Sequence, residues 1–270
     1  MPVTRDARPR RYLMCPPTYF TVAYEINPWM HQDVPTDTEL AVRQWEELKK
    51  TYDELGHEVE LIEPIPGLPD MVYAANGAVM GDGVVYSAKF TYPQRQPEGP
   101  AYEKWFADAG FPTVTATEIN EGEGDILTVG ELVFAGTGFR TSLASHLELQ
   151  EAIGKPVISM HLVDPRFYHL DTAMMVLSDD DIAYYPEAFS DGSRRVLERL
   201  FPDALIATEA DAEVLGLNGV SDGKNVIHNP RATALAAALA ERGYNPIGID
   251  TSELLKGGGG AKCCTLEIRA

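Results

Sequence analysis

The feature that most restricts the fold of this 270-residue chain is a near-constant internal repeat. Four segments share one plan, in which a polar residue precedes a short apolar run, a turn and a second short apolar run. They begin at Asn76, Asp125, Asp171 and Asn218, and Cys263 begins a truncated fifth copy. The leading residues lie 45 to 49 positions apart. A period of this size indicates a repeat architecture, in which each unit is one supersecondary element.

Helical segments lie between the paired apolar runs. Residues 38–55 have apolar side chains at near-helical spacing, with Asp37 or Thr38 suited to cap the start and Gly56 the end. Shorter helices are predicted near 101–109, 142–153, 192–200 and 231–243, the last with Asn229 as its cap. Short strands are predicted after them and after the first helix, at 58–62, 113–116, 157–161, 205–208 and 246–250. Each unit is therefore ββαβ, and this alternation predicts an α/β fold.

The repeat also predicts which side chains meet. In a closed array of such units, the leading residues occupy equivalent places near the central axis. Asn76, Asp125, Asp171 and Cys263 should therefore converge, together with His169. No Pro/Ser-rich linker interrupts the period, so residues 1–270 are expected to form a single domain.

Composition narrows the classes of partner. Lysine and arginine number 22 against 41 aspartate and glutamate, a net charge of −19. This charge disfavours nucleic acid and anionic membrane surfaces and suits a small cationic substrate. The chain has neither an apolar run long enough to span a membrane nor the apolar core of a signal peptide. Three cysteines make no disulfide framework, so a reducing cytoplasm is expected. A homo-oligomer is compatible with these features.

Two of the three cysteines, Cys263 and Cys264, stand side by side after the four glycines 257–260. Glycines let the backbone approach a ligand closely or adopt a positive φ. A nucleophilic thiolate has such needs, because it must be reachable and its pKa must be lowered by its surroundings. On the glycines alone, a flexible loop before a strand is an equally good interpretation.

Two kinds of chemistry are open to these residues. Cys263, Cys264, His169, Asp171 and Asp125 include competent metal ligands, but the spacings typical of zinc sites are missing and neighbouring sulfurs do not easily face one ion. We therefore expect no metal. The alternative is a cysteine hydrolase with either cysteine as nucleophile, His169 as acid/base, and a carboxylate of segment 121–125 orienting the imidazole. The remaining carboxylates match the fork of N–H donors on a guanidinium.

These residues also match a family. The sequence resembles the guanidine-modifying enzymes of the pentein superfamily, which are the arginine deiminases, dimethylargininases, arginine dihydrolases and amidinotransferases. The matching segments, in order along nearly the whole chain, are 27–30, 69–76, 93–96, 121–125, 138–142, 169–171 and 257–264. The resemblance implies a five-bladed α/β propeller of ββαβ units around a pseudo-five-fold axis, and one guanidine-modifying catalytic domain over 1–270.

The resemblance also implies roles for individual residues. The nucleophile would be Cys263, and His169 would be the general acid/base. Asp171, with Asp125, would hold the guanidinium. Arg140 and Arg95 would bind the α-carboxylate of the substrate. It implies no metal and no organic cofactor.

Two departures from the family pattern bear on the substrate. Deiminases and dimethylargininases usually carry an aspartate where this chain has Asn76. The usual Glu-Gly-Gly-Asp segment is one residue longer here, which leaves Glu121 or Glu123 to orient His169; we assign Glu123. Asn27 and Asn76, both expected to bind substrate, resemble the residues of arginine dihydrolases.

The sequence therefore predicts a cysteine-dependent hydrolase acting on the guanidino carbon of L-arginine or an N-methylated arginine, through a covalent thiouronium. An arginine dihydrolase, releasing ornithine and ammonia, is the preferred interpretation. A dimethylargininase or arginine deiminase giving citrulline is the alternative. An amidinotransferase, in which an amine accepts the amidino group, is an alternative of another class, and a non-catalytic amino-acid-binding protein is a third.

Overall fold

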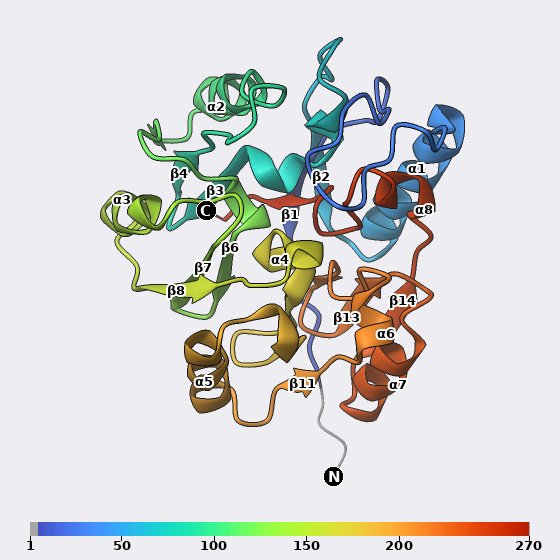
Figure 1. The fold of residues 1–270 in the computed structure, drawn as a ribbon, viewed down its shortest axis with the longest axis vertical. Helices are drawn as coiled ribbons and strands as arrows, with labels where there is room; N and C mark the ends of the chain where they lie inside the picture. Colours follow the sequence, from blue (N-terminus) through green and yellow to red (C-terminus); the bar gives the residue numbers. More distant parts are fainter. Residues whose placement is uncertain (1–4, 270) are drawn as a thin grey trace.

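The computed structural model describes residues 5–269, which form five three-stranded sheets (Figure 1). In each sheet the middle strand pairs antiparallel with one neighbour and parallel with the other. Four sheets follow one another along the chain: β3 (Ala78–Gly81), β4 (Val84–Ser87) and β5 (Thr113–Val114); β6 (Ile126–Val129), β7 (Leu132–Thr137) and β8 (Val157–His161); β9 (Met174–Val176), β10 (Ile182–Tyr184) and β11 (Leu205–Ile206); β12 (Val220–Ser221), β13 (Asn225–His228) and β14 (Asn245–Gly248).

One longer helix connects the second and third strands of each of these sheets. The helices are α2 (Glu98–Asp108), α3 (Leu143–Ile153), α5 (Asp191–Leu200) and α7 (Thr233–Glu241). Figure 1 shows them on the outside of the molecule, with the sheets arranged around its centre. The inner strands lie next to one another, since β9 contacts both β6 and β12, and β15 contacts β3. The predicted ββαβ repeat and the α/β class are thus confirmed, and the arrangement fits a five-bladed propeller.

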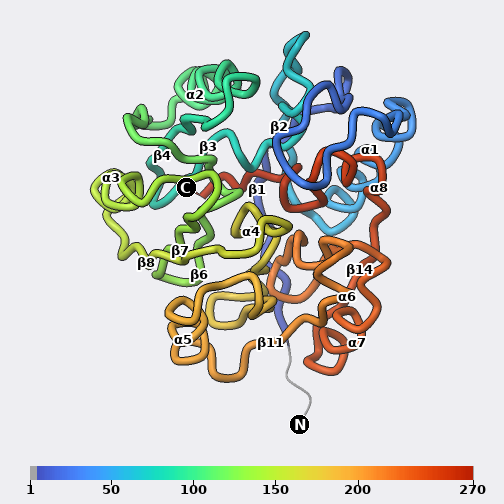
Figure 2. The backbone as a smooth tube through the Cα atoms, in the orientation of Figure 1, coloured from blue at the N-terminus to red at the C-terminus, as the bar shows by residue number. Residues whose placement is uncertain are grey.

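The remaining sheet combines the two ends of the chain. Its strands are β15 (Leu266–Glu267), β1 (Arg11–Met14) and β2 (Glu58–Leu61), with α1 (Thr38–Glu54) between β1 and β2. β1 pairs antiparallel with β15, and Leu13 lies opposite Leu266. Figure 2 shows the red C-terminal segment beside the blue N-terminal segment at the centre. The truncated copy that Cys263 begins is therefore completed by the start of the chain.

Local sequence signals account for the ends of the first helix. The Asp37 side chain accepts a hydrogen bond from Leu40 N over 2.9 Å and caps α1. Gly56, just beyond it, has a φ of +83°. The face that carries Ala41, Trp45, Leu48 and Tyr52 is buried. This helix confirms the prediction almost residue for residue.

The start of α7 differs from its prediction. The helix begins at Thr233, and Asn229 instead accepts a hydrogen bond from Arg231 N. The free amides of its first turn are bound by Asp211 in α6 (Glu209–Ala212), which accepts from Ala234 N (3.2 Å) and Leu235 N (3.1 Å). Asn229 is therefore not the cap, because a carboxylate from a neighbouring helix takes that place.

The residues that lead the repeats immediately precede the inner strands. Asn76, Asp125, Asp171 and Asn218 lie before or at the start of β3, β6, β9 and β12, and Cys263 lies before β15. All five side chains are buried. The fold thereby gathers one end of every inner strand around the same central region. Within residues 5–269, no helix has the length and apolar character needed to cross a membrane.

Candidate active site

The thiol of Cys263 lies after a glycine-rich turn that follows α8 (Ser252–Leu255). Gly258 has a φ of +91°, which glycine adopts without strain. A Cβ atom added at Gly257 would overlap the hydroxyl of Tyr73, so a side chain has no room there. These glycines allow protein to pack closely on protein, rather than a ligand to approach the backbone, and the turn holds Cys263 in one place.

Side chains from two other repeats hold the thiol. Cys263 Sγ donates to Asp171 Oδ2 over 3.1 Å and accepts from Asn218 Nδ2 over 3.1 Å. Asn218 Oδ1 in turn accepts from the amides of Gly260 (2.8 Å) and Cys263 (3.1 Å). Burial, followed by the charge of Asp171, raises the pKa of Cys263 well above its usual value. In this state the group is a neutral thiol at neutral pH.

The convergence predicted from the repeat is confirmed. Besides Asp171 and Asn218, the segment that leads β3 reaches the nucleophile, since Ala75 N donates to Cys263 O over 3.0 Å. A Cβ atom added at Gly124 would overlap Asn76 Nδ2 and lie 3.0 Å from His169 Nδ1, so these two side chains meet over that glycine. Asn218 also belongs to the site, where no role was predicted for it, although its leading position in the repeat was a signal that pointed there.

His169 is held by Glu121. Its Nε2 atom lies 2.7 Å from Glu121 Oε2, and both side chains are buried. Arg140 Nη1 donates to the same oxygen over 2.8 Å. Burial favours the protonated acid, but Arg140 and the hydrogen bond with His169 outweigh it and lower the pKa of Glu121 below its usual range. Glu121 is therefore an anion that fixes the ring and leaves Nδ1 to face the centre.

The assignment of Glu123 as the carboxylate next to His169 is wrong. Glu123 instead binds Lys262 Nζ at 2.7 Å, Arg269 Nη1 and the amide of Glu267. Burial is again outweighed, here by Lys262 and Arg269, so the pKa of Glu123 is lowered. The extra residue forms a 3₁₀ turn over Gly122–Gly124, in which Gly122 has a φ of +53°. This turn directs the two glutamates to different partners.

The two central aspartates differ in their contacts. Asp125 accepts from Leu170 N (3.0 Å) and Thr141 N (3.2 Å), one on each oxygen. Burial raises the pKa of Asp125 to about 6. Asp171 gives one oxygen to Cys263, and its Oδ1 has no hydrogen-bond partner among the residues described. Asp125 is thus bound to backbone that positions α4 (Leu170–Ala173), whereas Asp171 retains a carboxylate oxygen for a ligand.

The amide of Asn76 is oriented by a buried ion pair. Arg95 Nη1 donates to Asn76 Oδ1 over 2.9 Å, and Arg95 is held bidentately by Glu98 at 3.0 and 2.7 Å. The Asn76 NH₂ group, whose nitrogen has no partner within residues 5–269, therefore faces the centre as a donor. Burial raises the pKa of Glu98 to about 7, although Arg95 opposes the shift. In this structure the Arg95 guanidinium binds protein groups. It does not line a place for the α-carboxylate of a substrate.

Arg140 and Asn27 lie where the segment before α1 covers the site. Arg140 Nη2 donates to Ile26 O over 2.8 Å, and its guanidinium stacks between the rings of Tyr92 and Tyr168, 4.7 and 4.6 Å from their centroids. Asn27 Nδ2 donates to Gly257 O, and Asn27 Oδ1 accepts from Trp29 N. Both predicted substrate ligands thus join this segment to the site and engage protein atoms in this state.

Three buried polar atoms remain unpartnered at the centre within the described part of the chain. They are Asp171 Oδ1, Asn76 Nδ2 and His169 Nδ1. Buried polar atoms are normally hydrogen-bonded, so such a group marks a place where a polar ligand binds. The three atoms are a carboxylate acceptor, an amide donor and an imidazole nitrogen, and they accompany the thiol of Cys263. This set can bind a planar cation and move a proton while a nucleophile attacks.

The cysteines, His169 and the aspartates do not form a cluster with the geometry of metal ligands. In the described chain one such group occurs, Glu25, His31 and Asp33, and all three side chains are exposed on the surface. Exposed acidic groups are common without an ion, so we assign no metal to them.

Comparison with known proteins agrees with this geometry. The family profile of eukaryotic N,N-dimethylarginine dimethylhydrolase matches residues 17–270. The N(G),N(G)-dimethylarginine dimethylaminohydrolase of Mycobacterium tuberculosis is 54% identical over 99% of this chain and 88% of its own length. The bifunctional arginine dihydrolase/ornithine cyclodeaminase ArgZ of Synechocystis is 40% identical over 96% of this chain, which spans 37% of that longer protein.

A crystal structure of the N-terminal domain of ArgZ, in an asparagine-to-serine variant covalently bound to a reaction intermediate, superposes with a TM-score of 0.93. Its sequence is 37% identical, and the match covers 96% of this chain and 98% of that domain. The resemblance to the pentein superfamily is thereby confirmed.

Proposed function

Because the chain belongs to the N,N-dimethylarginine dimethylaminohydrolase family of hydrolases, we propose that it hydrolyses the guanidino carbon of an Nω-methylated arginine to citrulline and a methylamine. The observation that carries this proposal is the convergence of Cys263, Asp171 and the His169–Glu121 pair on one buried centre. The 54% identical relative supports the methylated substrate over the dihydrolase preferred from the sequence. We also propose that the ring of five sheets is a five-bladed propeller and that residues 1–270 form one catalytic domain.

The cationic substrate supplies a positive charge beside the thiol of Cys263. A guanidinium has only N–H donors, and Asp171 Oδ1 is an acceptor beside the thiol. The bound cation offsets the carboxylate that raises the pKa of Cys263, so the thiol ionises when substrate is present. This arrangement confines the reactive thiolate to the substrate complex.

The reaction then proceeds in two halves with His169 Nδ1 carrying the proton. Nδ1 takes the proton of the Cys263 thiol, and the thiolate forms a C–S bond to the guanidino carbon. The tetrahedral adduct breaks its C–N bond, and Nδ1 protonates the departing amine, leaving a thiouronium. Water then attacks with loss of one proton to Nδ1. The C–S bond breaks as the remaining hydroxyl proton passes to solvent, where it protonates the released amine, and the proton on Nδ1 returns to Cys263. Glu121 holds Nε2 throughout, which suits Nδ1 to both roles.

A second candidate, arginine dihydrolase, is favoured by Asn76. Arg95 binds its oxygen, so the NH₂ group points to the centre. A guanidinium offers this donor no acceptor, but the carbonyl of a ureido product does. Retention of citrulline by that contact would permit a second hydrolysis to ornithine. The match to the ArgZ domain supports this candidate too.

Product analysis by mass spectrometry separates the candidates. We expect asymmetric dimethylarginine to give citrulline and dimethylamine, with much lower kcat/KM on L-arginine and agmatine. Ornithine with two ammonia from L-arginine would establish the dihydrolase instead. Product formation only when glycine is added as acceptor would identify an amidinotransferase.

Two cysteine variants test the nucleophile. Cys263→Ser should abolish turnover and retain substrate binding, since a hydroxyl is far less ionised than a thiol near neutral pH. Cys264→Ser is the matched control and should keep most activity. Substrate binding without turnover by the unmodified protein would favour a binding module, and full activity of Cys263→Ser would exclude the proposed mechanism.

A further inference from the structure

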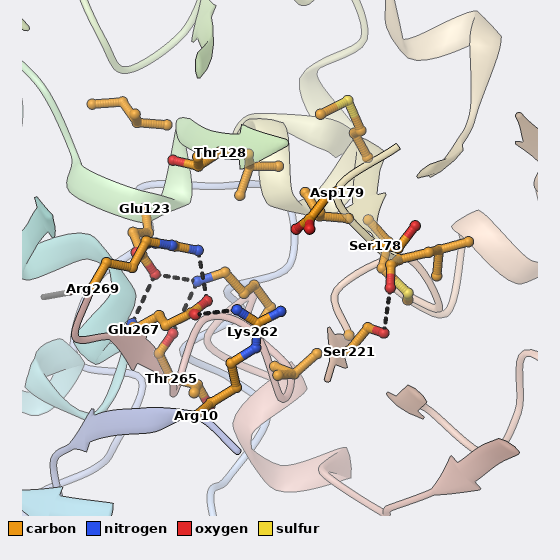
Figure 3. A pocket seen from close by; sticks show the side chains of 18 of the residues that line it. Arg10, Glu123, Thr128, Ser178, Asp179, Ser221, Lys262, Thr265, Glu267 and Arg269 are labelled. Carbon is orange, nitrogen blue, oxygen red and sulfur yellow. Dashed lines mark hydrogen bonds and ion pairs between the residues drawn. The ribbon is translucent and has the colours of Figure 1, made fainter. Parts of the chain in front are cut away.

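A cavity of about 210 Å³ lies along the inner strands of the sheets (Figure 3). The cavity extends along the inner strands, from Glu123 and Lys262, which precede β6 and β15, to Thr128 of β6, Ser178 after β9 and Arg269 after β15. Its walls, as far as the structure describes them, do not include Cys263, His169 or Asp171. The cavity therefore adjoins the site described above without including its reactive residues.

Charged side chains gather on one wall of the cavity. Figure 3 shows Arg10, Lys262 and Arg269 beside Glu123 and Glu267. Lys262 binds Glu123 at 2.7 Å, Arg10 Nη1 binds Glu267 at 3.0 Å, and Arg269 bridges both carboxylates. Three cations thus face two carboxylates here. With Lys155 and Asp179, which also line the cavity, four cations face three carboxylates among the described residues, so one further anion complements the cavity.

Two donors on residues that line the cavity lack acceptors within residues 5–269. The Tyr12 side chain is 1% exposed and lines the cavity, and its hydroxyl is buried without a hydrogen-bond partner. Arg10 also lines the cavity, and its Nε atom is likewise buried without a hydrogen-bond partner, although the side chain as a whole is 24% exposed. Burial raises the pKa of Tyr12 well above its usual value, so the hydroxyl remains a donor at all physiological pH values. A hydroxyl and a guanidinium N–H together suit one carboxylate.

Much of the remaining wall is apolar. Ile126, Leu127, Met174 and Val220 line the cavity without offering a polar side-chain atom. We propose that the cavity binds a small aliphatic monocarboxylic acid, with its carboxylate on Tyr12 and Arg10 and its hydrocarbon chain against these apolar residues. The apolar wall favours an organic acid over an inorganic anion, which would leave that surface without a partner.

The proposed site is connected to the thiol through the backbone. Lys262 immediately precedes Cys263, and Glu123 immediately precedes Gly124, against which Asn76 and His169 pack. A ligand at Tyr12 and Arg10 is therefore connected to Lys262, next to the nucleophile, through the ion pairs of Glu267, Arg269 and Glu123, without occupying the site of the nucleophile. The proposal does not depend on which guanidino compound is the substrate.

Butyrate is a suitable probe, measured by isothermal titration calorimetry and thermal unfolding at constant ionic strength. We expect butyrate to bind the full-length protein and raise its Tm. Tyr12→Phe should weaken binding roughly tenfold by removing one donor to a charged group. The variant keeps the ring and loses only an unpartnered hydroxyl, so its Tm without butyrate should be unchanged or higher. Tyr184→Phe, at a buried tyrosine outside this cavity, is the matched control and should bind butyrate normally.

Thr128→Leu tests the same site independently of the hydroxyl. The larger side chain should fill part of the cavity and abolish butyrate binding while leaving turnover intact. The proposal is overturned if the unmodified protein does not bind butyrate at tens of millimolar, or if Tyr12→Phe and Thr128→Leu both bind it normally. Binding that depends on Tyr12 but is equally tight for chloride or phosphate would overturn the assignment to carboxylic acids.

Discussion

His169 Nε2 lies 2.7 Å from Glu121 Oε2, while Glu123, two residues away in sequence, points to Lys262 and Arg269. The two glutamates are equally buried and chemically identical, so their different partners separate a catalytic role from a structural one. Variants of the two glutamates therefore test the catalytic role and the structural role separately.

Glu121→Gln should lower kcat by about 100-fold or more, because the imidazole loses the anion that fixes its tautomer and stabilises its protonated form. Glu123→Gln should instead lower the Tm and leave kcat within a few-fold, because it weakens a buried ion pair without touching His169. Steady-state kinetics and thermal unfolding of both variants check this. A large loss of kcat in Glu123→Gln alone would contradict the pairing in the structure.

The pKa of Cys263 should respond in opposite directions to its two side-chain partners. Beyond burial, the charge of Asp171 raises this pKa and the hydrogen bond from Asn218 lowers it. Asp171→Asn should therefore lower the pKa of the thiol, yet also lower turnover because the guanidinium loses its carboxylate. Asn218→Ala should raise the thiol pKa. The pH profile of iodoacetamide alkylation gives both values, and a rise in Asp171→Asn would refute the electrostatic account.

Glu98 should make stability depend on pH between its unfolded and folded pKa values. Its pKa is raised from 4.5 to about 7 by burial, so the folded state binds its proton more tightly than the unfolded state does. Its contribution to stability is complete below pH 4.5 and is lost as the pH rises through 7. The Tm of the unmodified protein, relative to Glu98→Gln, should therefore fall between pH 4.5 and 7 and level off above. A constant difference would show that Glu98 is already ionised at the lower pH.

Asn76→Asp should shift the products if the dihydrolase candidate is correct. A carboxylate would hold the cationic guanidinium by a charge-assisted hydrogen bond worth about 1.5–3 kcal/mol, but would gain little from neutral citrulline. We expect a higher ratio of citrulline to ornithine from L-arginine, measured by mass spectrometry. If the unmodified protein makes only citrulline or acts only on dimethylarginine, the dihydrolase candidate fails and the methylarginine hydrolase remains.

The repeat made much of this fold predictable. The regular spacing placed Asp125, Asp171 and Cys263 before inner strands, because equivalent units in a closed array bring equivalent positions together. The first helix was predictable because its cap, apolar face and terminal glycine are all local in sequence. By contrast, Asp211 caps α7 from another helix, and no local pattern contains that contact.

The errors in the site have a common physical origin. Glu121 and Glu123 were ambiguous because a single inserted residue changes the direction of a turn, and only the backbone of Gly122 decides which carboxylate faces the imidazole. Arg95 illustrates the same limit. Its guanidinium donates to Glu98 in the first turn of α2, so a protein carboxylate takes the place predicted for the α-carboxylate of the substrate. Residue type and order predicted which groups gather, but not how hydrogen bonds are shared among them.

The pairing of β15 with β1 has a consequence for folding. The ring closes only when residues 266–267 pair with residues 12–13, and these two segments are more than 250 positions apart in the sequence. Cys263 lies three residues before β15. The contact that closes the ring therefore also places the nucleophile, and a chain whose ring is still open has no positioned thiol.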